Sequence, residues 1–164
     1  AIAAPFNEDL LRFAGILAVL TLASRSHRPT ATEGICYGFL VGSGFEISEN
    51  LLFVLNADAP HDGIQVALIR TGLGFGLHAL WSGIQGALLV AALTRFRSRP
   101  LSGSSILATG ILAPMLLHSA WDAPSLLLDY RWTLAMLATI YLISIGTLAG
   151  LSIASARASG SGKR

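Results

Sequence analysis

Charged side chains are scarce in this sequence. Only 12% of its 164 residues are charged and 53% are hydrophobic, whereas a soluble domain carries about a quarter charged residues. This shortage of charge predicts a membrane protein and argues against a soluble domain. The formal net charge of +2 comes from basic residues spread over connections and tail, so we expect no nucleic-acid partner.

Cysteine is almost absent too. One cysteine, Cys36, excludes an internal disulfide framework and a zinc cluster held by thiolates, and its apolar and glycine neighbours favour a packing role.

The chain lacks an initiator methionine and a basic region ahead of an apolar one, so we expect it to continue upstream of Ala1. The H-E-x-x-H signature of soluble metalloproteases is missing, so a metal site would have to be assembled from different helices.

Long apolar segments are what the sequence has in abundance. Five of them approach the length of about 20 residues that crosses the hydrocarbon of a bilayer: residues 5–23, 34–55, 66–93, 105–121 and 132–154. They predict an all-α, polytopic transmembrane bundle of about five spanning helices. We expect a single domain over residues 1–156, followed by a polar, disordered cytoplasmic tail over residues 157–164.

The connections between these segments alternate in charge. The first and third connections and the tail are basic, and the second and fourth are acidic or neutral, with Asp58 and Asp129 as examples. Under the positive-inside rule, basic connections are cytoplasmic. The N-terminus is therefore expected outside and the C-terminus in the cytoplasm.

The segment 34–55 contains two carboxylates, Glu46 and Glu49, among apolar residues. A charge at the centre of a spanning helix costs roughly 2.5 to 3.5 kcal/mol, so such acids usually face a polar interior. The spacing of Gly34, Gly38 and Gly42 predicts a groove where another helix approaches closely, with Glu49 on the same face. We expect Glu46, which is off this face, to be a supporting or water-facing acid.

Other spans contain few polar residues, and these could meet Glu49 in one cavity that opens outward. They are Glu8, Asp9 and Arg12 in the first span, His78 in the third, and His118 and Asp122 at the end of the fourth. Two imidazoles with several carboxylates match a zinc site that keeps one position open. The alternatives are favourable placement of the acids near a helix start and ordinary interhelical hydrogen bonds.

Four short motifs follow one another along the chain, each built around these polar residues. They are residues 4–12, resembling A-P-x-x-E-E-x-x-K; residues 33–38 with Gly44-Phe45 and Glu49-Asn50, resembling D-G-x-x-Y-G and G-F-x-x-x-E-N; residues 78–83, beginning with His78; and residues 118–122, resembling H-x-x-x-N. Together they resemble the PrsW-type intramembrane metalloproteases, distant relatives of the CAAX-prenyl protease and bacteriocin-processing (CPBP) group. The resemblance covers nearly the whole chain.

The chain departs from the family pattern at four positions. Asp9 replaces a Glu, Arg12 a Lys, Phe53 a common Tyr and Asp122 an Asn. Asp9 is one methylene shorter than Glu, which changes its reach. Asp122 cannot donate a hydrogen bond as an amide does unless it is protonated, so it is expected to orient His118 or to bind metal.

The resemblance implies an enzyme of the bacterial cytoplasmic membrane that hydrolyses peptide bonds of membrane-tethered protein substrates near the outer face. We expect Glu49, His78 and His118 to hold a divalent metal, zinc by preference, whose bound water becomes nucleophilic. Glu8 is expected to be the general base, with Asp9 positioning it. Three residues have supporting roles: Arg12 balances the acids, Asp122 orients His118, and Asn50 lies behind Glu49.

Three other hypotheses remain open from the sequence. The glutamates and histidines could activate water without a metal, as in the prenyl-protease relatives. The chain could instead be a non-catalytic membrane subunit that keeps the fold and binds partner proteins or lipids, which the motif departures favour. A proton or cation carrier is the third, although the sequence shows none of the paired repeats that are frequent in transporters.

Overall fold

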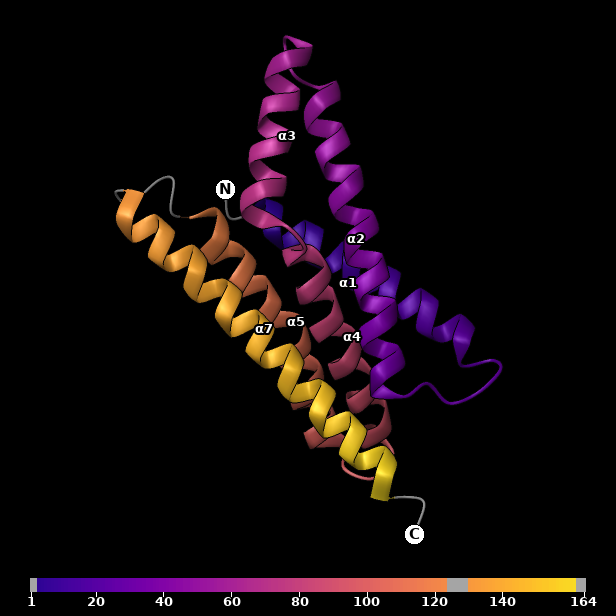
Figure 1. The fold of residues 1–164 in the computed structure, drawn as a ribbon. Helices are drawn as coiled ribbons and strands as arrows, with labels where there is room; N and C mark the ends of the chain where they lie inside the picture. The colour runs from indigo at the N-terminus through magenta and orange to yellow at the C-terminus, as the bar shows by residue number, and fades with distance from the viewer. Residues whose placement is uncertain (1–2, 124–129, 162–164) are drawn as a thin grey trace.

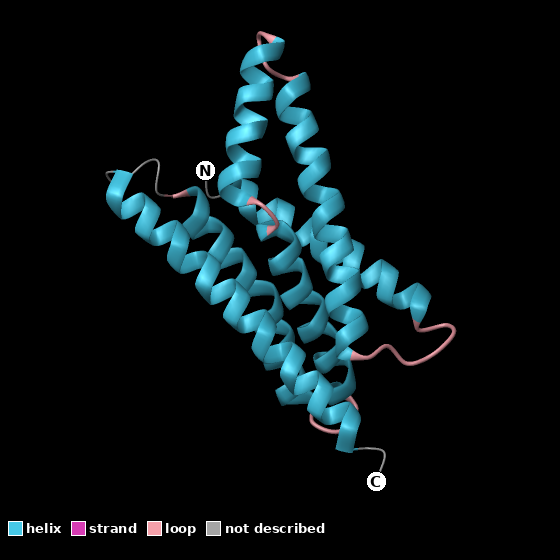
Figure 2. Cartoon of the chain, viewed as in Figure 1, coloured by secondary structure: helices cyan, strands magenta, loops and turns pink. Residues whose placement is uncertain are grey.

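The computed structural model describes residues 3–123 and 130–161, which form helices and no strand (Figures 1 and 2). The helices are α1 (Ala3–Ala23), α2 (Ala31–Leu55), α3 (Pro60–Gly74), α4 (Leu77–Phe96), α5 (Pro100–Asp122) and α7 (Tyr130–Ser161). The prediction of an all-α bundle is confirmed. Local signals explain several helix starts: Thr30 and Glu33 form a reciprocal capping box at α2, and Pro60 and Pro100 begin α3 and α5.

Helix α4 is the centre of the bundle. It packs against α1, α2, α5 and α7, and most of its side chains are buried, with Trp81 and Ala92 fully so. Among the described residues, four helices are long and apolar enough to cross a membrane: α2, α4, α5 and the Arg131–Arg157 part of α7. In the apolar stretch of three of them at most 22% of the residues are buried, as expected for helices that face lipid, whereas 72% of the stretch in α4 is buried in the interior.

The predicted span 66–93 is interrupted, which corrects the sequence interpretation. It is divided between α3 and α4 by a break at Gly76, whose φ of 73° lies in the left-handed region. The N–H of Gly76 donates to Oε1 of Glu46 at 3.2 Å. The hydroxyl of Tyr141 lies 3.0 and 3.1 Å from the carbonyl oxygens of Leu73 and Phe75. The break therefore satisfies its polar groups by using side chains of α2 and α7.

Helices α2 and α3 form a hairpin that extends beyond the other helices (Figure 1). Because α3 begins at Pro60, His61 and Asp62 lie in its first turn and not in the connection where the sequence placed them. Neither α3 nor α1 is among the candidate membrane spans of the described residues. Helix α1 is largely apolar apart from three charged residues in its N-terminal half, Glu8, Asp9 and Arg12.

The predicted glycine groove is present between α2 and α4. A Cβ added to Gly38 would collide with the carbonyl oxygen of Ser82, and one added to Gly42 would collide with that of His78. Gly34 meets Gly86 in the same way. Two backbones in such close contact leave no room for side chains. The groove thereby fixes the position of His78, in the first turn of α4, relative to α2.

One further prediction was wrong: Cys36 is exposed on α2 and does not fill the core. Helix α7 continues to Ser161 and so includes residues 157–161, the first part of the expected tail. The acidic residue Asp129 and the tail residues 162–164, which the charge analysis used, lie outside the described residues.

Candidate metal centre

Two buried histidines from different helices face each other at one end of α4. His78 lies in the first turn of α4 and His118 in the last turns of α5, with 7% and 3% of their surfaces exposed. Their ring centroids are 5.1 Å apart. The buried ring of Trp81 lies against both, with its centroid 4.9 Å from that of His118 and 5.8 Å from that of His78. This packing fixes both imidazoles.

Helix α1 supplies a carboxylate that holds His118. Oδ2 of Asp9 is 2.9 Å from Nδ1 of His118, and Oδ1 is 2.6 Å from Nη2 of Arg12. Asp9 and Arg12 are both almost fully buried. The other guanidinium nitrogen of Arg12 donates to the backbone oxygen of His78 at 3.3 Å. Arg12 therefore neutralises Asp9 and links α1 to α4.

The tautomer of His118 follows from these contacts. Nδ1 is also 3.2 Å from Nη2 of Arg12, but a ring nitrogen can either donate or accept, and the carboxylate of Asp9 can only accept. We assign a hydrogen to Nδ1 because the contact with Asp9 is the shorter one and Arg12 already has Asp9 as its acceptor. Nε2 of His118 then presents its lone pair to the opposite side.

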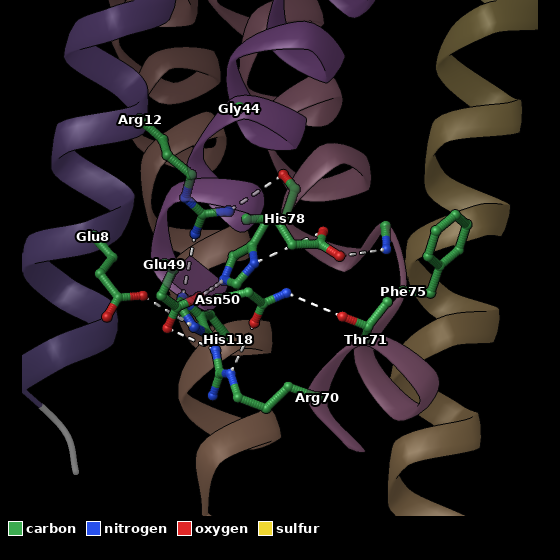
Figure 3. A network of polar contacts seen from close by, with 12 residues as sticks. Glu8, Arg12, Gly44, Glu49, Asn50, Arg70, Thr71, Phe75, His78 and His118 are labelled. Atoms are coloured by element: carbon green, nitrogen blue, oxygen red, sulfur yellow. Dashed lines mark hydrogen bonds and ion pairs between the residues drawn. The ribbon is translucent and has the colours of Figure 1, made fainter. Parts of the chain in front are cut away.

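Glu8 lies on that opposite side. Its Oε2 atom is 3.6 Å from Nε2 of His118 (Figure 3). Ligand atoms of Glu8, His78 and His118 all lie within 4.8 Å of one another. Glu8 and Asp9 are thus turned into the bundle, and favourable placement at a helix start does not account for them.

The acids of α2 surround His78. Oε2 of Glu49 is 3.8 Å from Nε2 of His78, and Oε2 of Glu46 is 4.0 Å from Nδ1. The other oxygen of Glu49 is held by Arg70 of α3 at 2.6 Å. The amide of Asn50 contacts Arg70 at 3.4 Å and donates to the hydroxyl of Thr71 at 3.1 Å (Figure 3). The α2–α3 hairpin therefore fixes Glu49 from behind.

Each histidine consequently has one carboxylate at Nδ1 and another near Nε2. In the part of the chain that the structure describes, three buried atoms in the space between them have no hydrogen-bond partner: Oε2 of Glu8, Oε2 of Glu49 and Nε2 of His78. An unsatisfied buried polar atom costs about 1–3 kcal/mol, so a cluster of them needs an explanation. Two carboxylate oxygens and imidazole nitrogens are ligands that suit a divalent cation such as zinc. The residues present fit such a cation.

Most of the predicted site residues meet in this cluster, but two do not. Asn50 contacts α3 and not the imidazoles. Asp122 was expected to orient His118, yet among the described residues these two form no hydrogen bond or ion pair, and Asp9 occupies Nδ1 instead. Two residues of the cluster were not predicted from the sequence: Arg70, a charge inside a predicted span, and Gln85, whose amide lies 3.5 Å from Asp9. The free-energy cost of placing a charge in a predicted membrane span, which drew attention to Glu49, applies equally to Arg70.

Comparison with known proteins gives one family and one curated relative. The model of the PrsW family intramembrane metalloproteases matches residues 1–149. Protease PrsW of Bacillus subtilis (strain 168) is 29% identical over 117 residues, which are 71% of this chain and 49% of the relative. The chain thus spans about half the length of that relative. No solved structure matches.

Proposed function

Because this chain belongs to the PrsW family of intramembrane metalloproteases, we propose that it hydrolyses peptide bonds of protein substrates embedded in or tethered to the membrane. It is an integral membrane protein with four apolar helices long enough to span the bilayer. One observation supports the proposal above all others. Three buried atoms of Glu8, Glu49 and His78, which have no hydrogen-bond partner among the described residues, lie near His118 in the interior of a membrane bundle.

We assign Glu8, His78 and His118 to hold the metal ion. Their ligand atoms form the group within 4.8 Å, and Asp9 orients His118 from behind, as carboxylates commonly do for metal-binding histidines. A divalent cation held there, which we propose to be zinc, would supply Lewis acidity and would lower the pKa of water toward neutral pH. The buried Arg12 offsets the negative charge that Asp9 adds.

Glu49 is the residue that we assign as general base. Its Oε1 atom is held by Arg70, which leaves Oε2 fixed and without a partner beside His78. The carboxylate takes a proton from the attacking water and returns it to the amine nitrogen as the C–N bond breaks. This assignment exchanges the roles that we expected for Glu8 and Glu49 from the sequence. Glu46, which caps the break at Gly76, stays a supporting acid.

The orientation of the chain follows from where the charges lie. The site is at the end of the bundle where α4 begins and α5 ends, and basic residues, among them Arg28, Arg95 and Arg97, lie at the opposite ends of α1 and α4. The positive-inside rule places those basic ends in the cytoplasm. We therefore propose cleavage near the outer face of a bacterial cytoplasmic membrane, with the N-terminus outside and the C-terminus inside.

The test is cleavage of a membrane-tethered reporter by purified, reconstituted protein. Glu8→Gln, His78→Ala and His118→Ala are expected to lose activity at least about 100-fold, because each removes one of the three residues assigned to hold the metal ion. Gly44→Ala is the matched control, since a Cβ at that position meets nothing within 4 Å. Cleavage undiminished in the three variants would overturn the proposal. Absence of bound zinc together with a stable complex of co-purified subunits would favour the non-catalytic alternative.

A further inference from the structure

A second cavity lies at the opposite end of α4 from the histidines. It has a volume of about 700 Å³ and lies between the C-terminal parts of α1 and α4, whereas the cavity beside His78 has about 120 Å³. The buried side chains of Leu20 and Val90 line it together with Leu17 and Leu93, which are 41% and 48% exposed. We call this cavity the α1–α4 trough. An open apolar trough of this kind accepts an apolar chain.

Two arginines line the same trough. Arg28 follows the end of α1 and Arg97 follows the end of α4, and both are exposed. Within the described part of the chain, neither guanidinium has a hydrogen bond or an ion pair. The neighbouring carboxylate of Glu33 is occupied, because one oxygen contacts His27 at 2.6 Å and the other accepts from the backbone N–H of Thr30 at 2.7 Å. Among the described residues, the two arginines of the trough therefore have no carboxylate in direct contact with them.

The ligand must combine an anionic head with an apolar chain. Guanidinium groups match the oxygens of a phosphate in geometry as well as in charge. Basic pockets between membrane helices bind the headgroups of anionic lipids. Arg97 lies beyond the end of α4, a candidate membrane span, which is where a headgroup meets a spanning helix, and Arg28 lies beyond the end of α1, which packs against α4.

We propose that the α1–α4 trough binds an anionic phospholipid. The headgroup phosphate lies between Arg28 and Arg97, and an acyl chain lies along Leu17, Leu20, Val90 and Leu93. This site is separate from the metal centre and does not depend on the proposed protease activity. It would tie the end of α1 to α4 through a lipid at the face opposite to the histidines.

The experiment compares lipid binding by two double variants of equal charge. The whole chain is purified in detergent, mixed with equal amounts of phosphatidylglycerol and phosphatidylcholine, and the retained lipid is counted by native mass spectrometry. The parent is expected to prefer phosphatidylglycerol. In Arg28→Gln/Arg97→Gln this preference should fall about tenfold or more, since each basic residue near a headgroup contributes measurably to its binding. Arg25→Gln/Arg99→Gln changes the same two connections outside the trough and should keep the preference.

A second pair of variants tests the apolar part. Leu93→Trp fills the trough while both arginines remain, and it should reduce the retained phosphatidylglycerol. Leu101→Trp is the control, because Leu101 is 86% exposed and does not line the trough. The proposal is overturned if the parent shows no preference, if both arginine pairs lose it equally, or if the arginine variants lose it while Leu93→Trp binds as the parent does. Equal loss in the two arginine pairs would indicate general surface charge only.

Discussion

Asp9 and His118 are 109 positions apart in the chain, yet Oδ2 of Asp9 lies 2.9 Å from Nδ1 of His118. The carboxylate that fixes this histidine thus comes from α1 and not from the neighbouring Asp122 of its own helix. Because Arg12 holds the other oxygen of Asp9, the orientation of the imidazole depends on three helices: α1, α5 and the α4 backbone that Arg12 contacts. The following predictions test this arrangement.

Asp9→Asn is expected to weaken zinc binding by about 10- to 100-fold, the usual effect of losing the group behind a metal-binding histidine. The amide can no longer balance Arg12, and it holds the tautomer of His118 less firmly. Zinc affinity is measured by competition with a chromophoric chelator. Asp122→Asn, which also restores the family residue, should bind zinc as the parent does. Weaker binding in Asp122→Asn than in Asp9→Asn would contradict the assignment.

Variants of Glu8 and Glu49 should distinguish loss of the bound metal from loss of the proton acceptor. Glu8→Gln is expected to lose both bound zinc and cleavage, since it removes a ligand. Glu49→Gln should keep its zinc and lose cleavage by about 100- to 10,000-fold, because only the proton acceptor is removed. Elemental analysis and a cleavage assay on the same preparations measure the two effects. The reverse pattern would restore the roles that the sequence first indicated.

Gly42→Ala should impair the site without touching any of its side chains. The added Cβ meets the backbone oxygen of His78, so α2 and α4 must move apart, and overpacking of this kind costs about 1–3 kcal/mol. We expect lower thermal stability and lower zinc affinity. Gly44→Ala on the same helix has open space around the new Cβ and controls for the change in helix propensity. If both variants have the stability of the parent, the contact between α2 and α4 is not as close as described.

Zinc should stabilise the folded protein through the histidines. At a zinc concentration of about 100 times Kd, a ligand that binds only the folded state adds about 2.7 kcal/mol. The unfolding temperature of the parent is expected to rise with zinc and to return to its starting value with a chelator. In His118→Ala the rise should disappear. An equal rise in both proteins would place the zinc elsewhere.

Much of the helix arrangement could be predicted because it depends on periodicity. Gly34, Gly38 and Gly42 recur every four residues, so they must share a face, and that face contacts α4. The four motifs likewise indicated that Glu8, His78 and His118 belong to one site. In the structure the three residues lie close together because α1, α4 and α5 pack on one another. These features require only that the segments be helical and buried.

Other features depend on contacts between residues of different helices, and helical periodicity does not predict which residues make these contacts. Asp122 is four residues after His118 and within reach on one helix, whereas Asp9 comes from a helix that adjoins α5 only after folding. The break at Gly76 lies in a run of apolar residues and glycines, so hydropathy continues across it. Arg70 lies in the same apolar run. Its ion pair with Glu49 could not be predicted because it forms only when α3 folds back on α2.

The direct contact between the backbones of α2 and α4 divides the chain into parts with different freedom to change during evolution. Main-chain atoms, not side-chain size, set the separation of the two helices at Gly38 and Gly42. Leu40 and Ile47 on the outward side of α2 are 67% and 70% exposed and can be exchanged for other apolar residues as the surrounding lipids require. A lineage that adapts to a new membrane can therefore vary that surface widely while the geometry of the candidate metal centre is inherited unchanged.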